Sequence, residues 1–402
     1  MKMSKQLCPE CGKTKTAGAP DGECPACLLA LGLAAALPCP ETIQLPPLAE
    51  PGERIGRYKL LEQIGEGGMG VVYLADQSVP FNKRVALKII KLGMDTKTVV
   101  ARFNAEYQAL ALMNHPSIAK VLDAGATDSG RPFFVMEYIR GMPITEYCDK
   151  QKLSTRQRLE LFIPVCQAIQ HAHQKGIIHR DIKPSNVLVA HFDGRPVPMV
   201  IDFGIAKATN QRLTQQTVFT RHGQFMGTLE YIAPEQAEGS QLDIDTRADI
   251  YSLGVLLYQL LTGTTPFPGK RLRESAWRET MRIIMEEEPP RPSLRLSTLT
   301  QLEETKLTGS HGGEAPRKIS LVLRRELDWV VMKCLEKDRS RRFETANGLA
   351  LELERYLKGE PLSSTPPTWG YQFSKLVPRI NCHLAIVPIN SYNQCSCLNT
   401  KS

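Results

Sequence analysis

The stretch that decides the fold is "IIHRDIKPSNVLV", which runs from Ile177 to Val189. It sets Asp181, Lys183 and Asn186 in the spacing D-x-K-x-x-N between apolar residues, a pattern that predicts an exposed polar loop with buried flanks. Asp181 can accept the proton of an incoming hydroxyl, Lys183 can neutralise charge on a transferring phosphoryl group, and Asn186 can give an oxygen to a metal ion. The stretch therefore predicts a loop suited to phosphoryl transfer.

A glycine array lies upstream, in "IGEGGMGVVY", where Gly65, Gly67 and Gly70 follow the pattern G-x-G-x-x-G. Glycines let backbone N–H groups approach phosphate oxygens because no Cβ intervenes. The chain continues as the strand-like run "VVYLAD" instead of opening a helix, which argues against a dinucleotide site. Taken alone, the array fits a tight hairpin turn as well as a nucleotide loop. The candidate nucleotide contacts are Ile64, Gly65, Glu66, Gly67, Gly68, Met69, Gly70, Val71 and Val72, the last of them facing the base.

A lysine stands in the middle of an apolar strand, Lys88 in "RVALKII". Burying an unpaired ammonium is costly, so the lysine requires an anion. Glu106, in the helical pattern "ARFNAEYQAL", could form a pair that holds Lys88 against the α- and β-phosphates of a nucleotide. The alternative is a lysine that reaches solvent from an edge strand, with Glu106 on a solvated helix face.

An aspartate at a flexible turn follows the loop, Asp202 in "MVIDFGIAKA". Its hard oxygen suits Mg²⁺, which bridges phosphates. The tripeptide D-F-G is common by chance. Its weight comes from the order along the chain: glycine array, strand lysine, helix glutamate, H-R-D loop, D-F-G and then "GTLEYIAPE".

In this order the motifs resemble those of the protein kinase superfamily over about residues 57–358. The residues within the motifs are similar to those of bacterial eukaryotic-type serine/threonine kinases. The resemblance implies an α+β, bilobal kinase fold. It implies a small β-rich lobe with one key helix over 55–140 and a larger α-helical lobe over 141–360. The implied reaction is transfer of the ATP γ-phosphoryl group, with Mg²⁺, to Ser or Thr hydroxyls of protein substrates. The dipeptide after Asp181 and the hydroxyl of Thr228 support the Ser/Thr form.

Secondary-structure patterns agree with two lobes. The β-branched runs "YKLLEQI", "VVYLADQ", "RVALKII" and "FFVMEYI" predict strands, with one helix between the last two. Further along the chain, apolar residues recur at helical spacing, as in "STRQRLELFIPVCQAIQHAHQKG" and "RADIYSLGVLLYQLLTG". The second of these predicted helices ends at Gly263 as its C-cap.

The resemblance assigns further roles around the nucleotide. Met136 becomes the gatekeeper, and the backbone of Glu137 and Ile139 meets adenine. Lys88 and Glu106 position ATP, and both count among the catalytic residues together with Asp181 and Lys183. Asn186 and Asp202 hold the metal ion. It also implies two structural contacts: Asp249 braces the catalytic loop, and Glu235 pairs with Arg342.

Arg180 directly precedes Asp181, which in this superfamily marks control by phosphorylation between D-F-G and A-P-E. A phosphate there could order the loop against Arg180. The candidates for modification are Thr214, Thr217 and Thr220; the distance to Thr228 favours Thr220.

Residues 1–36 raise a separate question, because four of the eleven cysteines form two C-x₂-C pairs. This grouping in a reducing compartment favours metal over disulfides. Four ordinary cysteines are the alternative, since the central spacer is shorter than usual. A zinc-ribbon-like segment of this kind could recognise a protein partner. The candidate Zn²⁺ ligands are Cys8, Cys11, Cys24 and Cys27.

The other segments are a Pro-rich linker (37–54), a polar stretch expected to be a mobile insert (291–318) and a C-terminal tail (361–402). No signal sequence or membrane span is visible, so a cytoplasmic location is expected. The net charge of +8 has no long basic runs, so no nucleic-acid partner is expected. Two rival functions stay open: a pseudokinase, and a zinc-ribbon adaptor with the kinase lobes as scaffold.

Overall fold

The computed structural model describes residues 49–67, 70–90, 110, 113–203, 229–238 and 244–364. Two compact units divide the chain at Ala49, and the second, Glu50–Ser402, carries all the elements described below. None of the helices in the described ranges is both long and apolar enough to cross a membrane.

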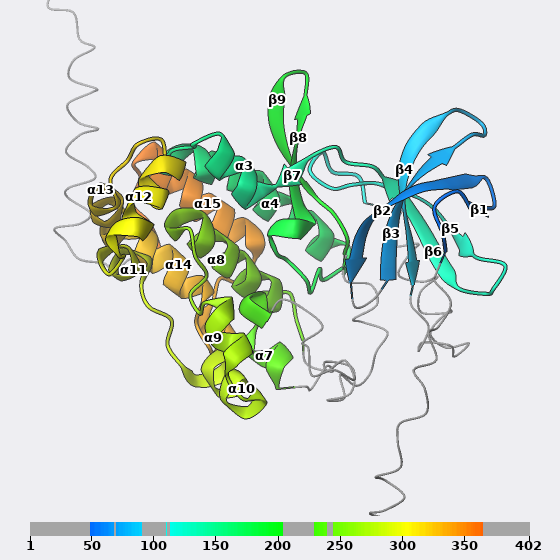
Figure 1. Cartoon of the computed structure of the whole chain (residues 1–402). Coiled ribbons are helices and arrows are strands. Elements are labelled where there is room, and N and C mark those ends of the chain that lie inside the picture. The colour runs from blue at the N-terminus through cyan, green and yellow to red at the C-terminus, as the bar shows by residue number, and fades with distance from the viewer. Residues whose placement is uncertain are drawn as a thin grey trace, which may run out of the picture. The chain divides into compact units, whose positions relative to one another are not determined.

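A six-stranded antiparallel sheet forms the first lobe, in the order β1-β2-β3-β4-β6-β5 (Figure 1). The four strands predicted from β-branched runs are confirmed, while β5, in the Gly- and Asp-containing run "VLDAGA", had no such signal. Central positions of this sheet, such as Leu60, Val85 and Leu87, are fully buried. The strands are β1 (Arg54–Ile55), β2 (Tyr58–Gly67), β3 (Gly70–Gln77), β4 (Lys83–Ile90), β5 (Val121–Ala126) and β6 (Pro132–Glu137).

A second, three-stranded sheet lies in the second lobe, which the sequence predicted to be mainly helical. It consists of β7 (Met142–Pro143), β8 (Val187–Phe192) and β9 (Arg195–Val200). Asp193 and Gly194, with φ of 49° and 75°, form the β8–β9 turn. An Asp-Gly pair is a sequence signal for a β-hairpin, which the helical patterns elsewhere in this lobe obscured. The hairpin matters for the site because β8 begins directly after Asn186.

Helices make up the rest of the second lobe. The two predicted ones are confirmed: Ser154 caps the first with a capping box, and Gly263 ends the second at φ 76°. The α-helices are α3 (Ile144–Lys150), α4 (Thr155–Gln174), α7 (Pro234–Ala237), α8 (Arg247–Thr262), α9 (Gly269–Glu274), α10 (Trp277–Glu286), α11 (Pro292–Ser297), α12 (Gln301–Ser310), α13 (Pro316–Val322), α14 (Asp328–Cys334) and α15 (Ala346–Lys358). The 3₁₀ helices are η2 (Pro184–Asn186), η3 (Leu229–Tyr231) and η6 (Arg339–Arg341), and η5 (Leu323–Leu327) is a π-helix.

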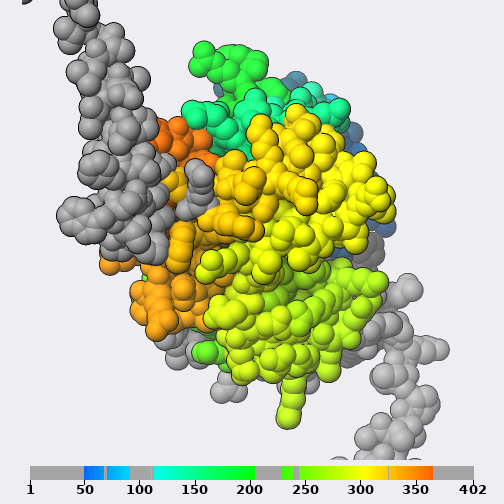
Figure 2. Space-filling model, turned by 90° about the vertical axis from the view of Figure 1, so that its left-hand side faces the viewer, coloured from blue at the N-terminus to red at the C-terminus, as the bar shows by residue number. Residues whose placement is uncertain are grey.

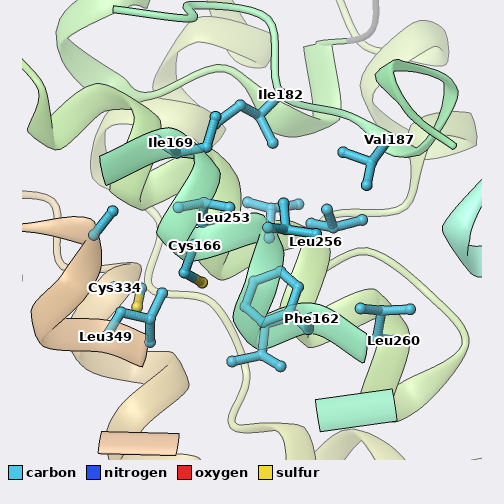
Figure 3. Close-up of a cluster of buried hydrophobic side chains, with 14 of the residues drawn as sticks. Phe162, Cys166, Ile169, Ile182, Val187, Leu253, Leu256, Leu260, Cys334 and Leu349 are labelled. Carbon is cyan, nitrogen blue, oxygen red and sulfur yellow. The ribbon is translucent and has the colours of Figure 1, made fainter. Parts of the chain in front are cut away.

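The main core of this lobe packs α4 and α8 against α14 and α15, and it also holds both flanks of the polar loop (Figure 3). Ile182, within the loop, and Val187, directly after it, are buried at 1% and 0% exposure, and Ile177, before the loop, packs against the same core. Phe162 of α4 and Leu256 of α8 lie in the same cluster. The loop that carries Asp181 is therefore anchored by apolar burial on both sides, as the opening stretch predicts.

The stretch 291–318, which the sequence predicted to be a mobile insert, has regular secondary structure, and its mobility stays a prediction. That stretch forms α11, α12 and the start of α13, which lie together on one face of the lobe beside α9 and α10 (Figure 2, yellow beside lime). A Thr300–Glu303 capping box starts α12, and Leu296 and Leu307 bury their side chains in the main core. Each helix is only six to ten residues long, so no period could be sustained across the segment.

Polar contacts also fix this segment to the lobe. The buried guanidinium of Arg158 in α4 donates to the carbonyl oxygens of Ser310 (2.7 Å) and Leu260 (3.1 Å). His311 is fully buried, and burial lowers its pKa to about 4, so the ring is neutral at physiological pH. These bonds satisfy groups that would be costly to bury alone.

Candidate active site

Twelve of the predicted site residues line one cleft of about 500 Å³, between the strands β2 to β4 and the loop before β8. The first lobe contributes Lys88 and glycines of the array, and the second contributes the two aspartates and Asn186. Segments more than a hundred residues apart thus meet. The predicted residues that line the cleft are Ile64, Gly65, Glu66, Gly67, Gly70, Val72, Lys88, Ile139, Asp181, Lys183, Asn186 and Asp202.

The glycine array forms the turn between β2 and β3, and its glycines serve different purposes. A Cβ at Gly70 would lie 2.3 Å from the carbonyl oxygen of Ile89 on β4, so close strand packing requires glycine there. A Cβ at Gly67 would meet no atom within 4 Å, so at that position the backbone faces open space. A ligand could therefore approach the backbone at Gly67 without a Cβ in the way.

Lys88 is buried in β4, at 8% exposure, and its ammonium contacts the Asp202 carboxylate. The ring centroid of Phe134 lies 5.8 Å from the same nitrogen. Lys88 therefore has the anion that burial demands, and the snorkelling alternative does not describe it. The predicted partner Glu106 lies outside the described residues.

The loop residues are tied to one another. Asn186 donates its side-chain amide to the carbonyl oxygen of Asp181 (2.8 Å) and to the carboxylate Oδ2 of Asp181 (3.1 Å). The Lys183 ammonium lies 2.9 Å from that Oδ2. With its nitrogen engaged, Asn186 keeps its amide oxygen as the group that could meet a cation. The carboxylate of Asp181 is held by two donors and yet is only part-buried, at the floor of the cleft.

Asp249, at the start of α8, holds the backbone just before Asp181. Its fully buried carboxylate accepts bonds from the backbone N–H groups of His179 and Arg180, both at 2.7 Å, and from His173 Nε2 at 2.8 Å. Burial opposes its ionisation, but the hydrogen bonds from His173 and from the backbone outweigh burial and lower its pKa. Arg180 adopts φ 64°, a conformation that costs energy for a side-chain residue and persists only where neighbours fix it. The predicted brace is confirmed.

His179 connects this loop to the D-F-G turn. Its ring stacks on Phe203 with centroids 4.6 Å apart, and Nε2 lies 3.2 Å from the carbonyl oxygen of Ile201. Burial lowers the His179 pKa, which favours the neutral ring. In that state Nε2 donates to Ile201, and Nδ1 accepts from the backbone N–H of Asp181 at 3.3 Å. Asp202, between these groups, has φ 57°, so its carboxylate is aimed by a strained backbone.

Glu235 and Arg342 form the predicted pair, with two parallel bonds of 2.6 and 2.8 Å. The guanidinium also donates to three carbonyl oxygens, among them that of Arg247 at the start of α8 (2.9 Å), and lies over the ring of Tyr251. The pair therefore fastens α7, which carries Glu235, to α8, which carries Asp249.

Other predicted positions fall elsewhere. Val71 and Glu137 lie in β3 and β6 and do not line the cleft. The backbone N–H of Glu137 donates a hydrogen bond to the carbonyl oxygen of Lys120. Five lining residues were not predicted: Tyr138, Gly141, Ser185, Leu188 and Ile201. Each is adjacent to or within three residues of a predicted one, which was the available signal. The predicted residues outside the described ranges are Gly68, Met69, Glu106, Thr214, Thr217, Thr220, Thr228 and the quartet Cys8, Cys11, Cys24 and Cys27.

The donor set at the cleft fits a magnesium nucleotide. Asp202 and Asn186 offer hard oxygens, and Mg²⁺ is usually held by one or two protein groups together with phosphates and water. In the part of the chain that the structure describes, no three His, Cys, Asp or Glu side chains are grouped to hold a metal by themselves. A Mg²⁺ ion held by Asp202 and Asn186 would take its other ligands from phosphates and water.

Comparison with known proteins gives a family. Residues 58–352 match the family model described as "Protein kinase domain". The chain is 36% identical over 290 residues to serine/threonine-protein kinase Pkn1 of Myxococcus xanthus, covering 71% of this chain and 39% of that protein. It is 33% identical over 319 residues to serine/threonine-protein kinase PknB of Mycobacterium tuberculosis, covering 78% and 45% respectively. The chain thus spans less than half the length of these curated relatives.

Solved structures agree on the fold. The crystal structure of the Mycobacterium tuberculosis PknI kinase domain superimposes with a TM-score of 0.53 at 24% identity, over 76% of this chain and 99% of that one. At that identity the likeness concerns the fold alone.

Proposed function

This chain belongs to the protein kinase family, and on that premise we propose that it transfers the γ-phosphoryl group of ATP to Ser or Thr hydroxyls of protein substrates. The observation that supports this most is the meeting of Lys88, Asp181 and Asp202 in one cleft below a glycine turn. Asp202 and Asn186 would hold Mg²⁺, whose positive charge would offset the negative charge that develops on the phosphates.

The residues of this chain then act by position and charge. Asp181 orients the acceptor hydroxyl and takes its proton, and Lys183, 2.9 Å away, offsets negative charge on the transferred group. Asn186 and Asp202 give oxygens to the cation. Lys88 exchanges its contact with Asp202 for nucleotide phosphates, so that a buried ammonium is paired both with and without ligand.

One experiment separates the proposed kinase activity from the two rival functions. The full chain is incubated with γ-labelled ATP, Mg²⁺ and a basic protein acceptor, beside Asp181→Asn and a matched Asp193→Asn variant at the exposed β8–β9 turn. The proposal requires label on Ser or Thr, lowered about 10²–10⁴-fold by Asp181→Asn and unchanged by Asp193→Asn. A pseudokinase or a zinc-ribbon adaptor transfers no label in any of the three samples.

We also propose Zn²⁺ for the quartet Cys8, Cys11, Cys24 and Cys27, on the strength of its C-x₂-C spacing. A truncation that removes residues 1–36 should lose one bound zinc per chain by elemental analysis while keeping phosphoryl transfer. Equal zinc in both proteins would refute this assignment. A partner for this segment, control through Thr220 and a cytoplasmic location stay predictions.

A further inference from the structure

A second hollow, of about 440 Å³, lies on the six-stranded sheet at the end away from the glycine turn. It is bounded by β1, the start of β2 and the β3–β4 turn, which is drawn in light blue in Figure 1. Four cationic side chains and one carboxylate line it, a net of three positive charges. We call it the basic hollow; its charged residues are Arg54, Lys59, Lys83, Arg84 and Asp76.

Strand register explains why these charges gather. Arg54 lies directly opposite Lys59, Lys59 opposite Asp76, and Asp76 opposite Arg84. Residues directly opposite share a sheet face with Cβ atoms about 4.5–5.5 Å apart, so the four side chains form one row across β1 to β4. Two like charges directly opposite, as at Arg54 and Lys59, destabilise a sheet. The fold thus places cations where strand pairing alone disfavours them.

The single carboxylate in the row leaves most of this charge available. Arg84 Nε is 3.9 Å from Asp76 Oδ1, and both side chains are about half exposed, at 55% and 51%. An exposed pair at that separation is weak and readily exchanged for another partner. Lys83 extends the positive surface towards the β3–β4 turn.

Apolar side chains border the same turn. Phe81 and Val79 are 79% and 61% exposed, the former the most exposed large apolar side chain in the described residues. Gln77 donates to the carbonyl oxygen of Val79 at 2.9 Å, which ties the turn to the rim of the hollow. Exposed apolar side chains at Phe81 and Val79 beside the basic hollow complement an acidic segment that carries an apolar residue.

We propose that the basic hollow docks an acidic segment of a protein partner, with an apolar side chain of that segment against Phe81 and Val79. A concave recess with a carboxylate at its centre disfavours the continuous phosphates of a nucleic acid and excludes a flat bilayer. The proposal goes beyond the phosphoryl-transfer activity, because none of these residues lines the catalytic cleft. Its failure would leave that activity untouched.

The test uses the full chain and a fluorescein-labelled peptide that contains four Glu residues around a Leu-Phe pair. Anisotropy at low salt should show binding that weakens about tenfold in the double variant Lys59→Gln/Arg84→Gln. The matched control Lys270→Gln/Arg278→Gln, on exposed α9 and α10, should bind as the parent does. A peptide with Gln for Glu should not bind.

A second variant separates the apolar contact from the charge. Phe81→Ser should weaken binding of the Leu-Phe peptide. It should leave binding of an all-acidic peptide unchanged, because that peptide contacts only the charged residues of the basic hollow. No variant should lower the melting temperature, because every replaced side chain is exposed. The proposal is overturned if the acidic peptide does not bind, if the two double variants weaken it equally, or if duplex DNA or phosphatidylserine vesicles bind the hollow more tightly than the peptide.

Discussion

The Asp249→Asn variant probes the support of the catalytic loop without touching the cleft. Oδ2 of Asp249 accepts from His173 and His179, and Oδ1 accepts from the Arg180 N–H. An asparagine can keep only one acceptor oxygen, so its NH₂ group must face a backbone N–H that then has no partner. The loss of one charge-assisted bond in a fully buried site corresponds to about 1.5–3 kcal/mol of unfolding free energy.

Activity should fall further than stability alone requires. Arg180, at φ 64°, is held in place by Asp249, and relaxation of this residue moves Asp181, which follows it. A displacement of about 1 Å at a catalytic group can cost about 10²-fold in turnover. We expect kcat to fall by about this factor while the KM for ATP stays close to that of the parent, because Asp249 does not line the cleft.

The assay pairs urea denaturation with steady-state phosphorylation of a short acceptor. Asp245→Asn is the matched control: it is the same chemical change in the turn before α8, where the carboxylate pairs with Arg247 on the surface. That variant should lose less than about 1 kcal/mol and keep its turnover. Parent-like kcat in Asp249→Asn, with the folded state intact, would refute the reasoning.

Two further changes test contacts outside the cleft. Glu235→Gln leaves the fully buried guanidinium of Arg342 without its anion, so the free energy of unfolding should fall by about 3–5 kcal/mol, measured by urea denaturation; a loss below about 1 kcal/mol would show that the pair contributes little. The second change is Glu352→Gln in α15, whose carboxylate accepts backbone and hydroxyl bonds from Ser363 and Ser364. Burial of Glu352 opposes ionisation, but these bonds lower its pKa, so its contribution is complete above the ordinary glutamate value and is lost as the pH falls through the lowered one. The parent and the variant should therefore differ by about 1–3 kcal/mol at pH 7 and converge in acid; a difference independent of pH would contradict this.

The catalytic loop could be predicted from sequence because its constraints are local. Asp181, Lys183 and Asn186 occur within six residues, and the apolar flanks at Ile177 and Val187 indicate an anchored loop. Strand patterns likewise extended over enough residues to reveal β2 and β4. In these places local sequence and tertiary packing favour the same structure.

Other features depend on contacts that no local pattern contains. The helices of 291–318 are short, and they are held by distant groups such as Arg158 and Asp328, the latter accepting from Ser293 at 3.0 Å. The contact between Lys88 and Asp202 joins residues 114 positions apart. The basic hollow arises from cross-strand register, which places Arg54 and Arg84 on one face although their sequence neighbourhoods are unremarkable.

The central claim is that Lys88 and Asp202 hold a magnesium nucleotide between the two lobes. Isothermal titration of ATP into the full chain, with Mg²⁺ and with EDTA, tests it for the parent and for Asp202→Asn. The account predicts that the parent binds ATP with Mg²⁺, and that both EDTA and Asp202→Asn weaken this binding at least about tenfold, because each removes a charge-assisted contact. Equal affinity in all of these samples, or no ATP uptake by the parent, would contradict it.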